Sequence, residues 1–280
     1  DGIPGLPHLG AAVRFDRQAR IDMGLYHTAL VHANVAHGVQ FERAEATDVH
    51  GGSPATVQLS DGWTLFADAV VVATNVPFHK RVTLHTKQMA YRSYVVAGTI
   101  AKGALPDALL WDDDDPYHYV RLAEIDGVGH VAVIGGEDHK TGQNEDPHAF
   151  ARLKEWANDY VPGVEQYTHG WSGQIIEPVD GLAYIGADPG GEANVFLVTG
   201  DSGNGVTHGT LGGLLIADLI AGRANPWAKL YDPSRKPVRA AGEWIRENTN
   251  VMMQFRDWLT GSDAEAVRGL GRGEGLGVGR

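Results

Sequence analysis

A strand, a glycine-rich loop and a helix follow one another between Asn194 and Ala221, and this order constrains the fold more than any other part of the sequence. Residues 195–199 form a short apolar run of the kind found in strands, and the loop 200–209 leads at once into a small-residue helical pattern. Backbone N–H groups at the start of such a helix lack partners within it, and the helix dipole adds partial positive charge. The glycines allow close approach. The segment therefore predicts a site for an anionic or electron-rich ligand group.

Composition and charge exclude several classes of function. The chain has 280 residues, of which 43% are hydrophobic and 21% charged, as in globular proteins. Lys and Arg number 23 against 35 Asp and Glu, a net charge of −12 that argues against nucleic acid or an anionic membrane as partner. There is no run of 18 apolar residues to predict a membrane span. We expect a cytoplasmic protein.

The sequence contains no cysteine, which removes disulfides, thiolate zinc sites, thiol nucleophiles and cysteine-ligated iron–sulfur clusters from consideration. We expect no metal site in this chain. The absence of cysteine also suits a reducing compartment.

The first part of the chain reads as α/β. Residues 21–37 predict an amphipathic helix, and short strands are predicted at 39–43, 47–50, 56–60 and 63–66, the last two joined by a hairpin at Asp61-Gly62. Residues 68–75 form a continuous β-branched run that ends at Ala73-Thr74-Asn75. Such a run is typical of a strand buried in a parallel sheet.

The pattern changes at about residue 85. Alternating segments at 91–101, 117–124, 130–135 and 166–176 predict antiparallel strands, and residues 150–160 predict a helix. A strand is predicted near 181–186, a further helix at 243–259, and a glycine-rich linker in the tail. The sequence therefore predicts an α/β domain over 1–84 and 177–249, an antiparallel insertion over 85–176, and a terminal helix and linker over 250–280.

These residues resemble the D-amino-acid oxidase-like group of FAD-dependent oxidoreductases, which includes glycine oxidase and sarcosine oxidase. The resemblance covers roughly residues 15–235. It is carried by residues 38–75, by Tyr117-His118-Tyr119-Val120-Arg121, by Trp171-Ser172-Gly173 with Asp180-Gly181-Leu182, and by the glycine loop. Residues 225–235 are similar to a subgroup whose members continue into a C-terminal Rieske iron–sulfur domain.

The resemblance implies a Rossmann-like FAD domain with an inserted antiparallel substrate domain. It implies hydride transfer from a small amine or amino-acid-like donor to FAD. The cofactor-binding residues that it implies are Ala73, Thr74, Gly200, Ser202, Gly203, Asn204, Gly205, Val206 and Thr207. Tyr119 and Arg121 share one face of a strand that roofs the flavin in the family, and His208 is the candidate for proton exchange with it. A Rieske domain is the implied electron-accepting partner in the parent protein.

Two departures from the family stand out. No strand–GxGxxG–helix unit occurs in the sequence, so we expect a fragment of a longer protein with an incomplete FAD domain. Without a central N-terminal strand, the strands at 70–72 and 195–198 are expected to lack partners and to expose an apolar edge. In addition, Gln174-Ile175-Ile176-Glu177 holds no arginine for a substrate carboxylate.

Two alternatives of other classes stay open from the sequence. The first is a non-catalytic interaction or assembly module of a larger flavoprotein, favoured by the missing fingerprint. The second is a nucleotide- or S-adenosylmethionine-dependent enzyme with a similar strand–loop–helix unit. The second would need an acidic residue closing the strand after the loop, and none is seen.

Overall fold

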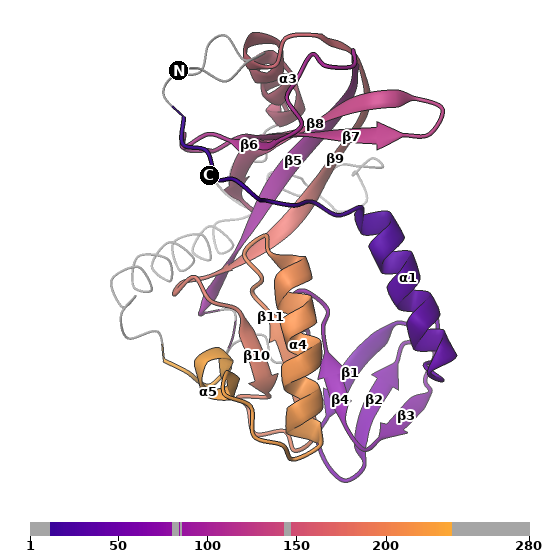
Figure 1. The fold of residues 1–280 in the computed structure, drawn as a ribbon. Coiled ribbons are helices and arrows are strands. Elements are labelled where there is room, and N and C mark those ends of the chain that lie inside the picture. The colour runs from indigo at the N-terminus through magenta and orange to yellow at the C-terminus, as the bar shows by residue number, and fades with distance from the viewer. Residues whose placement is uncertain (1–11, 80–83, 85, 143–146, 237–280) are drawn as a thin grey trace, which may run out of the picture. The chain divides into compact units, whose positions relative to one another are not determined.

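The computed structural model describes residues 12–79, 84, 86–142 and 147–236 (Figure 1). The chain divides into two compact units. Unit 1 comprises Asp1–Ala46, Leu59–Trp63 and Arg92–Gln174, and unit 2 comprises Thr47–Gln58, Thr64–Tyr91 and Ile175–Arg280. Within the described ranges, no helix has the length and apolar character needed to cross a membrane.

Unit 1 is built on a five-stranded sheet. In spatial order its strands are β6 (Leu109–Trp111), β7 (Tyr119–Ile125), β8 (Gly129–Lys140), β5 (Gln88–Ile100) and β9 (Val164–Pro178). β7 pairs antiparallel with both β6 and β8. The strands predicted at 91–101, 117–124, 130–135 and 166–176 are confirmed, although most of them are longer than predicted. β6 was not predicted, because three residues are too few to show a pattern.

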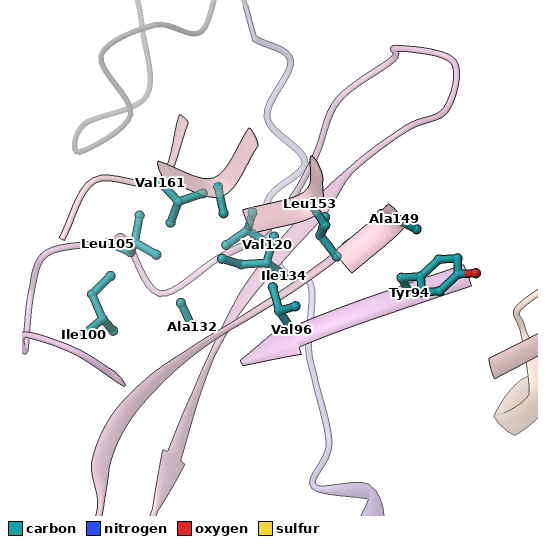
Figure 2. Packing of buried hydrophobic residues seen from close by; sticks show 11 residues of the cluster. Tyr94, Val96, Ile100, Leu105, Val120, Ala132, Ile134, Ala149, Leu153 and Val161 are labelled. Atoms are coloured by element: carbon teal, nitrogen blue, oxygen red, sulfur yellow. The ribbon is translucent and has the colours of Figure 1, made fainter. Parts of the chain in front are cut away.

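One helix covers one face of this sheet. α3 (Ala149–Tyr160) confirms the predicted helix and buries Ala149, Leu153 and Ala157, which lie four residues apart on one side of it. Figure 2 shows Leu153 beside Val120 and Ile134 of the strands. The alternate residues of the strands form a second buried cluster, made of Val95, Ala97, Val131 and Val133, against which Tyr119 packs. Tyr119 therefore lies on the sheet face opposite α3.

Unit 2 contains a three-stranded sheet whose strands, in order, are β10 (Tyr184–Ala187), β11 (Val195–Thr199) and β4 (Val70–Val72). β11 runs parallel to β4 and antiparallel to β10. The helix α4 (Gly205–Ile220) buries Leu215 and Ile216 against Ala183 and Ile185. The predicted strand–loop–helix order is therefore confirmed.

A second small sheet packs on the face of the first sheet that is opposite α4. There, Val49 and Val57 cluster with Val72 and Leu197. Its strands are β1 (Ala46–His50), β2 (Ala55–Leu59) and β3 (Thr64–Ala67). The predicted Asp61-Gly62 hairpin joins β2 to β3, and Gly62 has a φ of +91°. This turn requires glycine because its backbone is left-handed.

A short segment after α4 is held in place by Arg235 and by Lys87. It contains α5 (Ala228–Tyr231), and Arg235 follows it. Arg235 forms a two-bond ion pair with Asp180, with Nε–Oδ2 and Nη2–Oδ1 distances of 2.8 Å. Its Nη1 donates to the Ala183 carbonyl at 2.8 Å, and its guanidinium lies 3.8 Å from the centre of the Tyr184 ring. Lys87 Nζ donates to the carbonyls of Pro233 and Arg235 at 3.0 Å.

Several expectations are corrected. Residues 39–43 form no strand: Val39 and Phe41 are exposed, and the segment is irregular. The helix predicted at 21–37 is present as α1 (Met23–Ala36), but none of its residues is buried. The helix at 243–259 and the tail lie outside the described residues.

The sequence predicted that the strands at 70–72 and 195–198 would lack neighbouring strands. This prediction is wrong for β11 and is confirmed for one side of β4. β11 lies between β10 and β4. β4 is the edge of this sheet in the described part of the chain, and Val71 is 45% exposed.

Candidate functional site

The carboxyl ends of β4 and β11 lie side by side. Val72 is paired with Leu197 in the parallel register, so Ala73-Thr74 and Thr199-Gly200 leave the sheet at the same edge. Thr199 Oγ1 donates to the Asn75 carbonyl at 2.5 Å, which ties the two strand ends together. In open α/β sheets, ligands bind outside the carboxyl ends of the strands. The structure thus brings the predicted residues Ala73 and Thr74 next to the predicted glycine loop.

The glycine loop has a backbone that only a few residue types adopt. Gly200 and Gly203 have a φ of +73°, and Ser202 has a φ of +49°. A β-carbon at Gly200 would also lie 2.6 Å from Pro178 Cγ, so position 200 has room only for glycine. The Ser202 N–H donates to the Ile176 carbonyl at 3.0 Å and holds the loop to the end of β9. These φ angles and this hydrogen bond therefore define the course of the loop.

The start of α4 presents unpartnered donors. The first-turn N–H groups of Gly205, Val206 and Thr207 have no acceptor within the helix, and all three residues are exposed. Asn204, the residue before the helix, makes no side-chain capping bond, and the first turn contains no acidic residue. These donors and the helix dipole suit an electron-rich or anionic group.

Two titratable side chains, Asp201 and His208, lie next to the glycine loop. The Asp201 carboxylate lies beside Gly205, since a β-carbon at position 205 would be 2.9 Å from Asp201 Oδ2. His208 Nδ1 lies 3.0 Å from the Asp201 carbonyl, and its ring meets Tyr231 edge-on at 6.2 Å. A carbonyl only accepts, so Nδ1 carries the proton and Nε2 is the ring nitrogen left for proton exchange.

Tyr119 and Arg121 belong to unit 1 and share one face of β7. Tyr119 is half-buried and Arg121 is exposed. Burial raises the pKa of the Tyr119 phenol; the nearby Asp138 carboxylate adds to this, while Ser93 and Arg121 oppose it. The phenol therefore stays protonated at neutral pH and can donate a hydrogen bond.

Three polar residues near these positions were missed by the sequence analysis. Gln88 is 5% exposed, and its Oε1 lies 3.3 Å from Thr199 Oγ1. Ser93 and Asp138 lie close to Tyr119. A polar residue inside an otherwise apolar strand was the available signal for Ser93. Nothing in the sequence pairs it with Asp138, because that pairing depends on the order of the strands.

One aspartate has a partner that the sequence did not reveal. Asp112 Oδ1 accepts from the His118 N–H at 2.6 Å, and its Oδ2 lies 3.1 Å from His118 Nδ1. The His118 ring stacks on Trp156 at 4.2 Å. This aspartate is therefore structural.

Comparisons with known proteins place the chain in a family. A family model described as FAD-dependent oxidoreductase (DAO) matches residues 1–219. The "Putative Rieske 2Fe-2S iron-sulfur protein YhfW" of Bacillus subtilis (strain 168) is 26% identical over 227 residues, which cover 80% of this chain and 44% of that protein. Glycine oxidase of Geobacillus kaustophilus (strain HTA426) is 27% identical over 199 residues, which cover 69% of this chain and 51% of that protein. The chain thus spans about half the length of these relatives.

Solved structures share the fold. The crystal structure of glycine oxidase from Geobacillus kaustophilus matches with a TM-score of 0.61 at 23% identity, covering 75% of this chain and 57% of that one. L-proline dehydrogenase from P. horikoshii matches with a TM-score of 0.61 at 19% identity, covering 75% and 58%. The predicted α/β fold with an antiparallel insertion is confirmed by these likenesses. Because the family model matches well over half of the sequence, the chain belongs to the DAO family of FAD-dependent oxidoreductases.

Proposed function

We propose that this chain forms the flavin-ring and substrate side of an enzyme that oxidises a small amine or amino-acid-like donor by hydride transfer to FAD. The observation that carries the proposal is the glycine loop between β11 and α4. Its open backbone, exposed first-turn N–H groups and place beside Ala73-Thr74 at the carboxyl end of a parallel strand pair fit an electron-rich ring edge.

The residues of unit 2 would hold the cofactor. The N–H groups of Gly205, Val206 and Thr207 would donate to the electron-rich edge of the flavin, and Gly203 leaves the space for it, since nothing lies within 4 Å of a β-carbon built there. Gly200, Ser202 and Asn204 set the course of the loop, and Ala73 and Thr74 would line the neighbouring strand end. When bound, FAD supplies the hydride acceptor. The helix dipole would stabilise negative charge on the reduced ring.

The residues of unit 1 would bind the donor. Arg121 would bind an anionic group of the substrate, and the protonated Tyr119 phenol would donate a hydrogen bond to it. We assign residues 85–176 to substrate binding, 1–84 and 177–249 to the FAD domain, and 250–280 to a terminal helix and linker. His208 Nε2 is the proposed proton-exchanging atom.

We further propose that electrons leave the flavin through an iron–sulfur cluster in the full-length protein. The support is the name of the Bacillus subtilis relative, which calls it a Rieske 2Fe-2S protein. The absence of cysteine in this chain means that it would supply no cysteine ligand to such a cluster. This absence also suits a cytoplasmic enzyme.

One observation favours the alternative of a non-catalytic assembly module. α1 has no buried residue, and Leu25 and Leu30 on it are 72% and 47% exposed. Exposed apolar surface of this kind marks interaction sites. In that case the chain would bind a partner protein and no flavin.

The test is the visible absorption spectrum of the purified chain, taken with added FAD and again after dialysis. We expect a retained flavin band. Thr207→Asp should abolish it, because a carboxylate in the first turn of α4 repels an electron-rich ring edge although it suits the helix dipole. The uncharged Thr207→Asn should keep it. Retention of flavin by Thr207→Asp would mean that the cofactor does not bind at the loop. No retention by the natural chain or by the full-length protein would favour the assembly module.

A further inference from the structure

Three neighbouring strands of unit 1 bring a small polar cluster together on the sheet. Ser93 comes from β5, Tyr119 from β7 and Asp138 from β8, which lies between them. Ser93 is 6% exposed, and its Oγ lies near the Asp138 carboxyl and the Tyr119 phenol but has no hydrogen-bond partner among the described residues. Glu137 has a φ of +60°, which interrupts the regular course of β8 just before Asp138. The cluster is therefore formed by strand order and a local backbone irregularity.

The Asp138 carboxyl in this cluster is short of partners. Its Oδ1 is buried and has no hydrogen-bond partner among the described residues. Burial raises the pKa of Asp138; Ser93, His118 and His139 act against this rise but do not cancel it. A buried carboxylate oxygen without a donor costs free energy, and a cationic donor would remove that cost.

Opposite charges act on the same phenol. Asp138 raises the pKa of Tyr119 and Arg121 lowers it, so an anion and a cation both lie within electrostatic range of the Tyr119 hydroxyl. Arg121 is exposed and sits two residues from Tyr119 on the same face of β7. A small molecule that carries both a positive and a negative group would be complementary to this surface.

We propose that Asp138, with Ser93, binds the cationic ammonium end of a substrate whose anionic end is bound by Arg121 and Tyr119. The inference rests on the proposed function for its choice of Arg121 as the anion-binding residue, and it adds the residue that distinguishes amines from simple carboxylates. The ammonium would donate to the Asp138 carboxylate and to the Ser93 hydroxyl. Asp138 is thus a specificity-determining residue.

The other titratable groups near Asp138 have contacts of their own within unit 1. His139 stacks on Tyr94 at 5.6 Å, and His118 is occupied by Asp112 on Nδ1. Glu137 forms an ion pair with Arg152, in which Arg152 Nε lies 2.7 Å from Glu137 Oε2. Among these groups, Asp138 is the acid with a buried oxygen that has no donor in the described part of the chain.

The test compares two probes on the purified chain, each titrated while its amide NMR signals are followed. Glycine carries both charges and acetate carries only the negative one. Asp138→Asn should weaken glycine binding about tenfold or more, because a charge-assisted bond is lost, and should leave acetate binding unchanged. Asp126→Asn, which makes the same charge change in the exposed turn between β7 and β8, should alter neither.

Thermal unfolding separates a binding role from a structural one. Asp138→Asn should keep or raise the unfolding midpoint, because it removes a buried carboxylate that lacks a donor. Equal weakening of both probes, or a lowered midpoint with unchanged preference for glycine over acetate, would overturn the proposal. So would the absence of glycine binding to the natural chain. Flavin retention is read separately from the absorption spectrum, so failure of the cofactor assignment does not mask either result.

Discussion

The ring of Tyr119 lies directly over Gly135, its partner across the β7–β8 pairing. The two residues are in register, and a β-carbon at position 135 would overlap the Tyr119 ring carbon Cζ and its hydroxyl. Glycine at this position therefore allows the ring to lie flat along the sheet. The position of a candidate substrate-binding side chain is set by a residue on the next strand.

Gly135→Ala should displace the Tyr119 ring and destabilise unit 1. Inserting one methyl group into a filled space costs about 1–3 kcal/mol of unfolding free energy. Urea unfolding measures the loss. The double variant Gly135→Ala with Tyr119→Ala should be less destabilised than the sum of the two single variants, because the collision is then absent. Additive losses would show that the two side chains do not compete for space.

Arg235→Leu should detach the segment after α5 from β10. The side chains of Arg235 and Asp180 are only 14% and 20% exposed, so removing Arg235 leaves the Asp180 charge largely buried and unpaired. We expect a loss of about 3 kcal/mol in unfolding free energy. The matched control is Arg223→Leu, because the Arg223 side chain is 60% exposed and its partner Asp218 lies at the surface; this variant should lose far less stability. Similar losses in both variants would contradict the assigned role of Arg235.

Tyr184→Phe should leave the free energy of unfolding unchanged or raise it by about 1 kcal/mol. The reason is that a buried hydroxyl without a hydrogen-bond partner contributes no stabilisation. Tyr184 Oη is buried with no hydrogen-bond partner among the residues that the structure describes. Burial raises the pKa of this phenol to about 12, although the Arg235 charge opposes the shift. The ring contact with Arg235 is kept in the variant.

Tyr167→Phe is the control for Tyr184→Phe, since the Tyr167 hydroxyl donates to Asn158 Oδ1 at 2.9 Å. It should lose about 1 kcal/mol on denaturant unfolding. A larger loss at Tyr184 than at Tyr167 would mean that the buried hydroxyl does have a partner.

Asp180 should make acid stability depend on Arg235. Burial alone would raise the pKa of Asp180, but the hydrogen bonds and charge of Arg235, with the Leu182 N–H, lower it below its usual value. A lowered carboxylate pKa contributes stability that is complete at neutral pH and is lost as the pH falls through the folded-state value. The penalty of Asp180→Asn should therefore be constant near neutrality and shrink below about pH 4. Unfolding free energies measured from pH 7 downwards test this, and a penalty that grows on acidification would contradict it.

Sequence reasoning succeeded where the signal was local. The Asp61-Gly62 hairpin and the strand–loop–helix order around Gly200 follow from contiguous residues, and both were predicted. The prediction of a strand at 39–43 was wrong, because an apolar segment forms a strand only where a neighbouring strand pairs with its backbone N–H and C=O groups. The apolar residues of α1 likewise predicted a buried face that the described part of the chain does not cover.

The sequence by itself determined the candidate cofactor loop, since glycines, a preceding apolar run and a following helix are read within about 30 residues of one another. Tertiary structure alone decided that β10 flanks β11, that Tyr119 lies over Gly135, and that the strands carrying Ser93 and Asp138 are neighbours. The physical reason is strand register. Pairing between distant segments depends on the packing of whole faces, and a shift of one residue would turn each of these side chains to the opposite face of its sheet.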